Sequence, residues 1–316
     1  MDVKNRGPES ILGLWSSKKG CDWCNAPRAE ALKQCTGCAA IRYCSKECQS
    51  AAWPNHKHIC SSRSALKVPS IYSMLGHTTS IELLHAGLDW WGVHKLIFYM
   101  FATVLVELGG GVDDGLKAPR AVVFELGPPF ASGFDRSPST RFTLKSMGFV
   151  HRDALDGCTG PQWFDSSIAY RDSLGQFFRS TIPNPDAAGI IPVTFTFRDS
   201  TITAQTGLPL FRPRGGAVDQ RTKTVLKKLL EIGTVGINTG TVLRIPTNAS
   251  QSVPDIGKLV REGKSWTWTP YASPARIPMM QFRAPAPDDA FAAYHRLWPY
   301  SSLLTTPLVT DIPKPT

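Results

Sequence analysis

The feature that most constrains this chain is the spacing of its cysteines between residues 21 and 60. Seven of its eight cysteines fall in that stretch, and they come in pairs together with one histidine. The pairs are Cys21 with Cys24, Cys35 with Cys38, Cys44 with Cys48, and His56 with Cys60. Two intervening residues suit a tight turn around one ion, and an i, i+4 offset puts two ligands on one face of a helical turn. The spacing therefore predicts a metal-binding module.

Eight soft ligands divide into two tetrahedral sites, the geometry of structural zinc. In a cross-braced arrangement the first pair shares an ion with the third, and the second pair shares one with the fourth. The first site is then Cys21, Cys24, Cys44 and Cys48, and the second is Cys35, Cys38, His56 and Cys60. So short a segment cannot bury a useful core, and the metals must supply its folding free energy, roughly 10–16 kcal/mol for structural zinc in small peptides.

Two histidines, His56 and His58, compete for the last ligand position. His56 stands four residues before Cys60 and shares its face of a helix, whereas His58 points elsewhere. Pro54 just before them is compatible with a helix start. We therefore expect His56 to bind the metal and His58 to be a solvated surface residue.

The remaining composition sets limits on compartment and partners. The N-terminal residues have no long apolar run of the secretory type, so the clustered cysteines indicate metal ligands in a reducing compartment, nucleus or cytoplasm. The apolar run at 96–106 is too short to span a bilayer; we expect a buried helix, with a membrane-associated segment as the alternative. The net charge of +10 hints at acidic partners. Direct nucleic-acid binding is not expected, because the finger lacks a long recognition helix and regular one-zinc spacing.

Along the chain we expect an N-terminal tail (1–20), the finger (21–60), a polar linker (61–70), an α+β body (71–283) and a proline-rich C-terminal segment (284–316). Helices are expected over 80–108, 163–179, 221–232, 252–262 and 288–298. Strands are expected over 120–126, 141–150, 190–198, 234–245 and 265–271. Because these helices and strands mix without βαβ regularity, the predicted class is a small cross-braced two-zinc finger followed by an α+β domain.

The residues around the ligands make the pattern more specific. CTGC, IRYC, SKECQ and HKHIC, with Tyr43, Gln49 and Trp53 at their places among the ligands, resemble the MYND zinc finger. The resemblance implies two zinc ions and an adaptor role, with transcriptional regulation as a setting. Some members bind short proline-containing peptides of PxLxP type, and by resemblance the groove positions fall on Thr36, Gln49 and Trp53. The alternative is packing alone, with Trp53 covering the second site and Gln49 capping the helix.

Enzymatic function of the body is the competing hypothesis. The Asn-His-x-Cys stretch and cysteine-rich segment of SET methyltransferases are missing from the sequence. The segment 122–127, VVFELG, resembles the first motif of Rossmann-type methyltransferases, but prolines follow where a Gly-x-Gly turn should approach the cofactor. No spacing links the catalytic residue types Asp165, Ser166, His94, His151 and Cys158 into a triad. We therefore name no catalytic residue, and a methyltransferase-like body stays the alternative.

The body also resembles, more weakly, that of uncharacterised fungal MYND proteins, in which a helix with tryptophan and histidine precedes a strand like RAVVFEL. Trp90, Trp91 and His94 carry that resemblance here. It implies architecture only. On this helix we expect His94 to be a hydrogen-bonded core residue, with a metal-ligand role as the alternative.

Overall fold

The computed structural model describes residues 21, 23–24, 32–37, 42–64, 68–77, 79–117, 120–129, 137–151, 185–200, 202–246, 248, 250–272 and 287–299. The described residues divide into two compact units, one up to Leu83 and the other from Leu84 onward. The predicted tail, most of the proline-rich segment and the helix expected at 163–179 lie outside them. The domain limits drawn from the sequence stay a prediction.

The first unit contains the finger and a short helix after it. Strands β1 (Lys33–Gln34) and β2 (Arg42–Tyr43) pair antiparallel. Helix α2 (Lys46–Ser64) follows, and α3 (Ser70–Ser73) comes next in the chain. Helix α2 begins at Lys46, so Pro54 lies inside it and does not mark its start.

The body of the protein is built on a mixed four-stranded sheet in the order β4-β3-β5-β6. Strand β3 (Arg120–Gly127) runs parallel to β5 (Ala187–Phe197), while β4 (Thr143–His151) and β6 (Thr203–Phe211) are antiparallel to their neighbours. The α+β class is confirmed. The described strands do not form the doubly wound parallel sheet to which the methyltransferase motif belongs.

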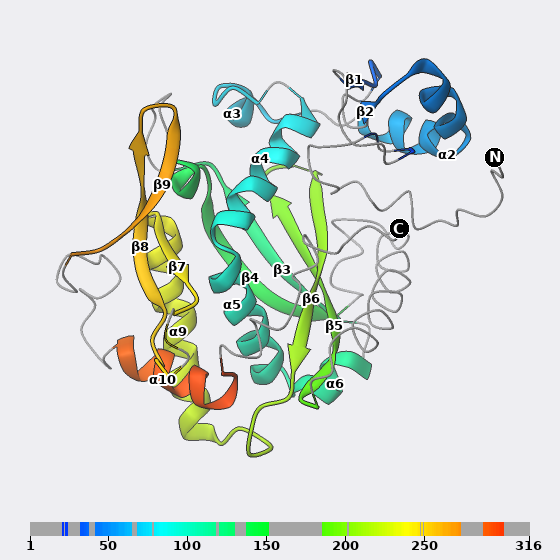
Figure 1. Cartoon of the computed structure of the whole chain (residues 1–316). Coiled ribbons are helices and arrows are strands. Elements are labelled where there is room, and N and C mark those ends of the chain that lie inside the picture. Colours follow the sequence, from blue (N-terminus) through cyan, green and yellow to red (C-terminus); the bar gives the residue numbers. More distant parts are fainter. Residues whose placement is uncertain are drawn as a thin grey trace. The chain divides into compact units, whose positions relative to one another are not determined.

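Helix α5 (Lys95–Leu108) is the central element of the body. Its residues are apolar nearly all round and most of them are buried, as expected of a core helix. It follows α4 (Ser80–Val93) and contacts β3, β4 and β6 on the sheet and α9 (Gln220–Asn238) elsewhere (Figure 1). Aromatic rings fill the interface with the sheet: Phe98 lies 4.8 Å from Phe124 and 5.2 Å from Phe195, centroid to centroid. The buried-helix prediction for 96–106 is confirmed.

The remaining elements of the body include a second, smaller sheet. Helix α6 (Val112–Lys117) follows α5, and a three-stranded antiparallel sheet consists of β7 (Thr241–Arg244), β8 (Asp255–Glu262) and β9 (Ser265–Pro270). A 3-10 turn, η1 (Pro138–Thr140), precedes β4, and α10 (Pro287–Leu297) packs on α9.

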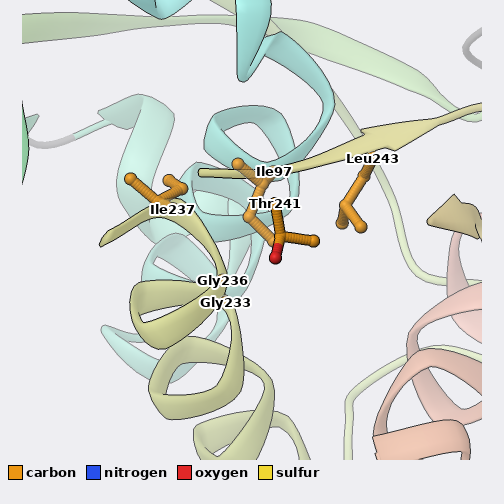
Figure 2. Close-up of a pocket in the computed structure, with 6 residues that line it drawn as sticks. All are labelled: Ile97, Gly233, Gly236, Ile237, Thr241 and Leu243. Carbon is orange, nitrogen blue, oxygen red and sulfur yellow. The ribbon is translucent and has the colours of Figure 1, made fainter. Parts of the chain in front are cut away.

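A shallow hollow lies where α5, α9 and β7 meet (Figure 2). Its lining is Ile97, Gly233, Gly236, Ile237, Thr241 and Leu243. The Thr241 hydroxyl is the one polar side-chain group of this lining, so the hollow offers little that could bind or transform a polar ligand.

Three expected elements differ from those observed. The helix expected over 80–108 ends at the predicted glycines but is broken at His94, whose side chain bonds to another segment. Residues 234–238 continue α9, because its glycine-rich face packs on α5. Residues 255–262 form a strand, not a helix, because they pair with β9 through a turn at Gly263, whose φ is 61°.

Among the described residues, no single helix is both long and apolar enough to cross a membrane. Helices α4 and α5 meet that test only as a pair, Glu82–Val93 with Lys95–Leu108, bent by 84°.

Candidate metal centres

The first metal centre brings together Cys21, Cys24, Cys44 and Cys48, with all four sulfurs within 4.8 Å of one another. The Cys24 and Cys44 sulfurs are 3.6 Å apart, and those of Cys44 and Cys48 are 3.5 Å apart. Cys21 is buried and Cys44 is exposed. Four thiols in this geometry form the complete donor set of a tetrahedral zinc site. These are the four residues that cross-bracing assigns to one ion.

The second metal centre contains Cys35, His56 and Cys60, all buried. Nε2 of His56 lies 3.3 Å from the Cys35 sulfur, and the Cys35 and Cys60 sulfurs are 3.7 Å apart. Of the two competing histidines, His56 is therefore the one in the cluster. Cys38, the fourth predicted ligand, lies outside the described residues. Its assignment stays a prediction, and it would complete a tetrahedral Cys₃His set.

Helix α2 supplies ligands to both centres. Its i, i+4 spacing directs one set of side chains inward. The inward set is Cys48, Ala52, His56 and Cys60. Cys48 belongs to the first centre, and His56 with Cys60 to the second. The two centres are consequently interleaved through a single rigid element.

The apolar core of the finger is small and consists largely of the ligands themselves. Its buried residues are Cys21, Cys35, Tyr43, Ala52 and Cys60. Tyr43 packs edge-on to His56 with ring centroids 6.3 Å apart, which holds the imidazole from one side. A core of this size cannot stabilise a fold by burial alone.

Gly37 permits the close approach of Cys60 to the turn after Cys35. A Cβ at Gly37 would stand 2.7 Å from the Cys60 sulfur and 3.8 Å from that of Cys35. Ordinary contacts to carbon begin above 3.4 Å, so any larger side chain would displace the sulfur. Sequence reasoning missed this residue, although a glycine between two cysteines was a visible signal.

Without a metal, the thiols of the first centre cannot all ionise. Burial opposes ionisation of Cys21, but hydrogen bonds from the backbone of Cys24 and Cys44 outweigh it and lower the pKa of its thiol to about 7. Hydrogen bonds with the side chains of Cys48, Cys24 and Cys21 raise the pKa of Cys44 to about 12. The cluster holds protons that a divalent cation displaces, since metal ligation requires thiolates.

The predicted partner-binding residues lie on the same unit. Trp53 is 45% exposed, and its ring is 5.8 Å from that of His56, tilted by 60°. Gln49 is half-buried one helical turn before Trp53, and Thr36 is exposed in the turn after Cys35. Trp53 thus touches the second centre and still presents nearly half of its surface.

The residues that were considered from the sequence because their types can be catalytic either take part in the hydrogen bonding and secondary structure of the body or lie outside the described residues. His94 is 1% exposed and bonds through Nε2 to the Ser139 carbonyl at 2.8 Å, so the prediction of a hydrogen-bonded core histidine is confirmed. Glu125, in the strand that resembles the methyltransferase motif, accepts a hydrogen bond from Ser146 on the neighbouring strand at 2.9 Å. His151 ends β4. Cys158, Asp165 and Ser166 lie outside the described residues.

These two centres define the class of the first unit: a cysteine- and histidine-rich module that binds two zinc ions and has hardly any other core. The family model of the MYND finger matches residues 21–60. The finger is therefore a MYND finger, as the ligand spacing and the residues around it predict.

The chain is also similar to the Zinc finger MYND domain-containing protein 10 homolog of Drosophila melanogaster, 43% identical over 37 residues. That match covers 12% of this chain and 8% of the relative. The chain thus spans less than a tenth of the length of the curated relative it matches. No solved structure matches the chain. The comparisons accordingly identify the finger, residues 21–60.

Proposed function

We propose that this protein is an adaptor whose finger recruits a partner by binding a short proline-containing peptide at Thr36, Gln49 and Trp53. The observation that carries the proposal is the exposure of Trp53, 45%, which makes it the one exposed large hydrophobic side chain among the described residues of the finger. Exposed tryptophans are enriched at the energetic centres of protein interfaces. A nuclear or cytoplasmic setting and a role in transcriptional regulation remain part of this proposal.

The neighbours of Trp53 suit an extended peptide. Gln49 stands four residues before it on α2, so the amide lies beside the indole on the helix surface. An aromatic face accepts proline rings, and an adjacent amide can both donate to and accept from a peptide backbone. Thr36 adds a hydroxyl from the turn after Cys35. Packing alone leaves the exposed half of the indole unexplained.

A direct binding measurement tests the proposal. The probe is a fluorescent peptide with the core Pro-Ser-Leu-Ser-Pro between glycines, and the readout is anisotropy with the full chain. We expect saturable binding that Trp53→Ala weakens at least tenfold and Gln49→Ala weakens less. Ala51→Ser, at an exposed position of the same helix outside this surface, is the control and should leave binding unchanged. Equal affinity of wild type and Trp53→Ala would overturn the proposal.

A further inference from the structure

The outer face of α2 carries a stripe of exposed side chains around Trp53. Its members recur at intervals of four, three and four residues, so they share one side of the helix. They are Lys46, Ser50, Trp53 and Lys57, and all four are exposed. The stripe contains none of the predicted metal ligands, and the Trp53 ring is its contact with the ligand His56. The tryptophan is bracketed by a lysine on each side.

Helix stability does not account for the position of Lys46. It opens α2, where the positive end of the helix macrodipole disfavours a cation. Glu47 beside it is the acidic residue that this position favours. The helix dipole therefore does not favour a lysine here, and its exposed ammonium group adds positive charge to the stripe.

Pro54 removes one helical hydrogen-bond donor beside the same stripe. Proline has no N–H, so the carbonyl of Ser50, four residues earlier, lacks its helical hydrogen bond. Ser50 and Pro54 are both exposed, one on either side of Trp53. The face therefore combines an aromatic surface, a carbonyl acceptor and two cations.

We propose that the occupant of this face is an acidic peptide, with carboxylates on both sides of the residue that contacts Trp53. This inference rests on the proposed function and specifies the partner: a proline-containing segment bracketed by Asp or Glu. Charge complementarity carries it, because Lys46 and Lys57 are both exposed and bracket the indole along the helix.

Geometry sets the spacing of the carboxylates. Lys57 lies eleven positions after Lys46 in the sequence. At a rise of 1.5 Å per residue this offset is about 16 Å along the helix axis. An extended or polyproline-type peptide covers that distance in about five or six residues at 3.1–3.3 Å each. Two acidic residues about six positions apart, one on each side of a five-residue core, therefore match the lysines within the reach of their side chains.

Three labelled peptides test the inference on the full chain with two zinc ions bound. All share the core Pro-Ser-Leu-Ser-Pro, flanked on both sides by Gly, Asp or Lys. We expect the Asp-flanked peptide to bind about fivefold to twentyfold more tightly than the Gly-flanked one at low salt, since each exposed charge pair contributes about twofold to fivefold. The Lys-flanked peptide should bind more weakly than both. The advantage of the acidic peptide should shrink as salt is added.

The double variant Lys46→Glu, Lys57→Glu reverses the charge of the stripe and should reverse the order of the three peptides. Glutamate at position 46 suits the helix N-terminus, so a reversed order cannot be attributed to unfolding. Metal analysis of the variant should still give two zinc ions per chain. The control is the double variant Lys227→Glu, Lys264→Glu, the same charge change at two exposed positions of the body, which should leave the order unchanged.

The outcomes separate this inference from the proposed function. If the Gly-flanked peptide binds through Trp53 and acidic flanks add no affinity, the acidic partner is wrong and the proposed function stands. If acidic peptides bind and Trp53→Ala changes nothing, the face binds by charge alone and the proposed function is wrong. If none of the three peptides binds, both are overturned.

Discussion

His94 donates a hydrogen bond from Nε2 to the main-chain carbonyl of Ser139 over 2.8 Å, at the point where α4 gives way to α5. The indole N–H of Trp90 donates to the same carbonyl at 3.1 Å. The Ser139 carbonyl, in the turn before β4, thus accepts hydrogen bonds from Trp90 in α4 and from His94 at the junction of α4 and α5. The break between the two helices is fixed by this contact, not by a proline or glycine.

Replacing His94 should destabilise the body. The change His94→Ala removes a buried ring and one of two donors to the Ser139 carbonyl, so we expect a loss of about 2–4 kcal/mol. Urea unfolding monitored by tryptophan fluorescence measures it. The control is His151→Ala at the exposed end of β4, which should cost less than about 1 kcal/mol. Equal effects of the two changes would contradict this account of the helix junction.

His94 should also make stability depend on pH. Burial outweighs its hydrogen bonds and lowers the pKa of its imidazole to about 4, whereas an unfolded histidine titrates near 6.5. Its contribution to stability is therefore present in full above about pH 6.5 and is lost as the pH falls toward 4, by about 3 kcal/mol in total. The measurement is the difference in unfolding free energy between wild type and His94→Gln at several pH values. Other acid-sensitive groups are common to both proteins and cancel, and a difference independent of pH would refute the assignment.

Gly37→Ala should weaken the second zinc centre selectively. The new methyl group would stand 2.7 Å from the Cys60 sulfur and push that ligand out of position. We expect at least a tenfold loss of affinity for one of two zinc ions, measured by competition with a chromophoric chelator. Ser50→Ala, on the outer face of α2, is the control and should retain both ions. Loss of both ions at the same chelator concentration would show that the centres do not release zinc separately.

Removing zinc should unfold the finger and leave the body folded. Metal analysis should find two zinc ions per chain, since two Cys/His clusters are compatible with two zinc ions. A strong chelator should then abolish the ordered amide signals of residues 42–64 in an NMR spectrum, because this segment has hardly any apolar core. Signals from α5 and β3 should persist, as their core is independent of metal. A finger that stays ordered without zinc would contradict the prediction.

Gly233→Ala should destabilise the contact between α9 and α5. A Cβ at this position would stand 2.5 Å from the Phe101 ring and 2.7 Å from the Ile97 side chain. Overpacking of this kind costs about 1–3 kcal/mol, which exceeds the gain in helix propensity. Thermal unfolding measures the loss. Gly92→Ala is the matched control, because that helical glycine has nothing within 4 Å, and it should be neutral or slightly stabilising.

Sequence reasoning reached furthest where the chemistry is local. Ligand pairs two or four residues apart specify which atoms can meet, so the first metal centre and the described part of the second follow from spacing alone. Strand β3 and helix α10 were predicted because their patterns match their final environment. In each of these cases a window of about ten residues contains the deciding information.

Elements decided by distant contacts were harder to predict. The strand β8 has the composition of a short helix and is a strand because β9 pairs with it across Gly263. Residues 234–238 are rich in β-branched residues and glycine, yet they continue a helix whose small side chains let α5 approach. Gly37 owes its importance to Cys60, twenty-three positions later. In each case the deciding partner lies outside any local window.

The sharing of α2 by both metal centres has a thermodynamic consequence. The same helix holds ligands of both ions and presents Trp53, whose ring contacts His56 and is still 45% exposed, so an ion and a peptide stabilise the same folded segment. Linkage is reciprocal: a peptide that binds only the folded finger must strengthen zinc binding by the same free energy with which zinc promotes peptide binding. Recruitment by such a finger would respond to the supply of free zinc, and the partner in turn would raise the equilibrium affinity of the finger for the metal.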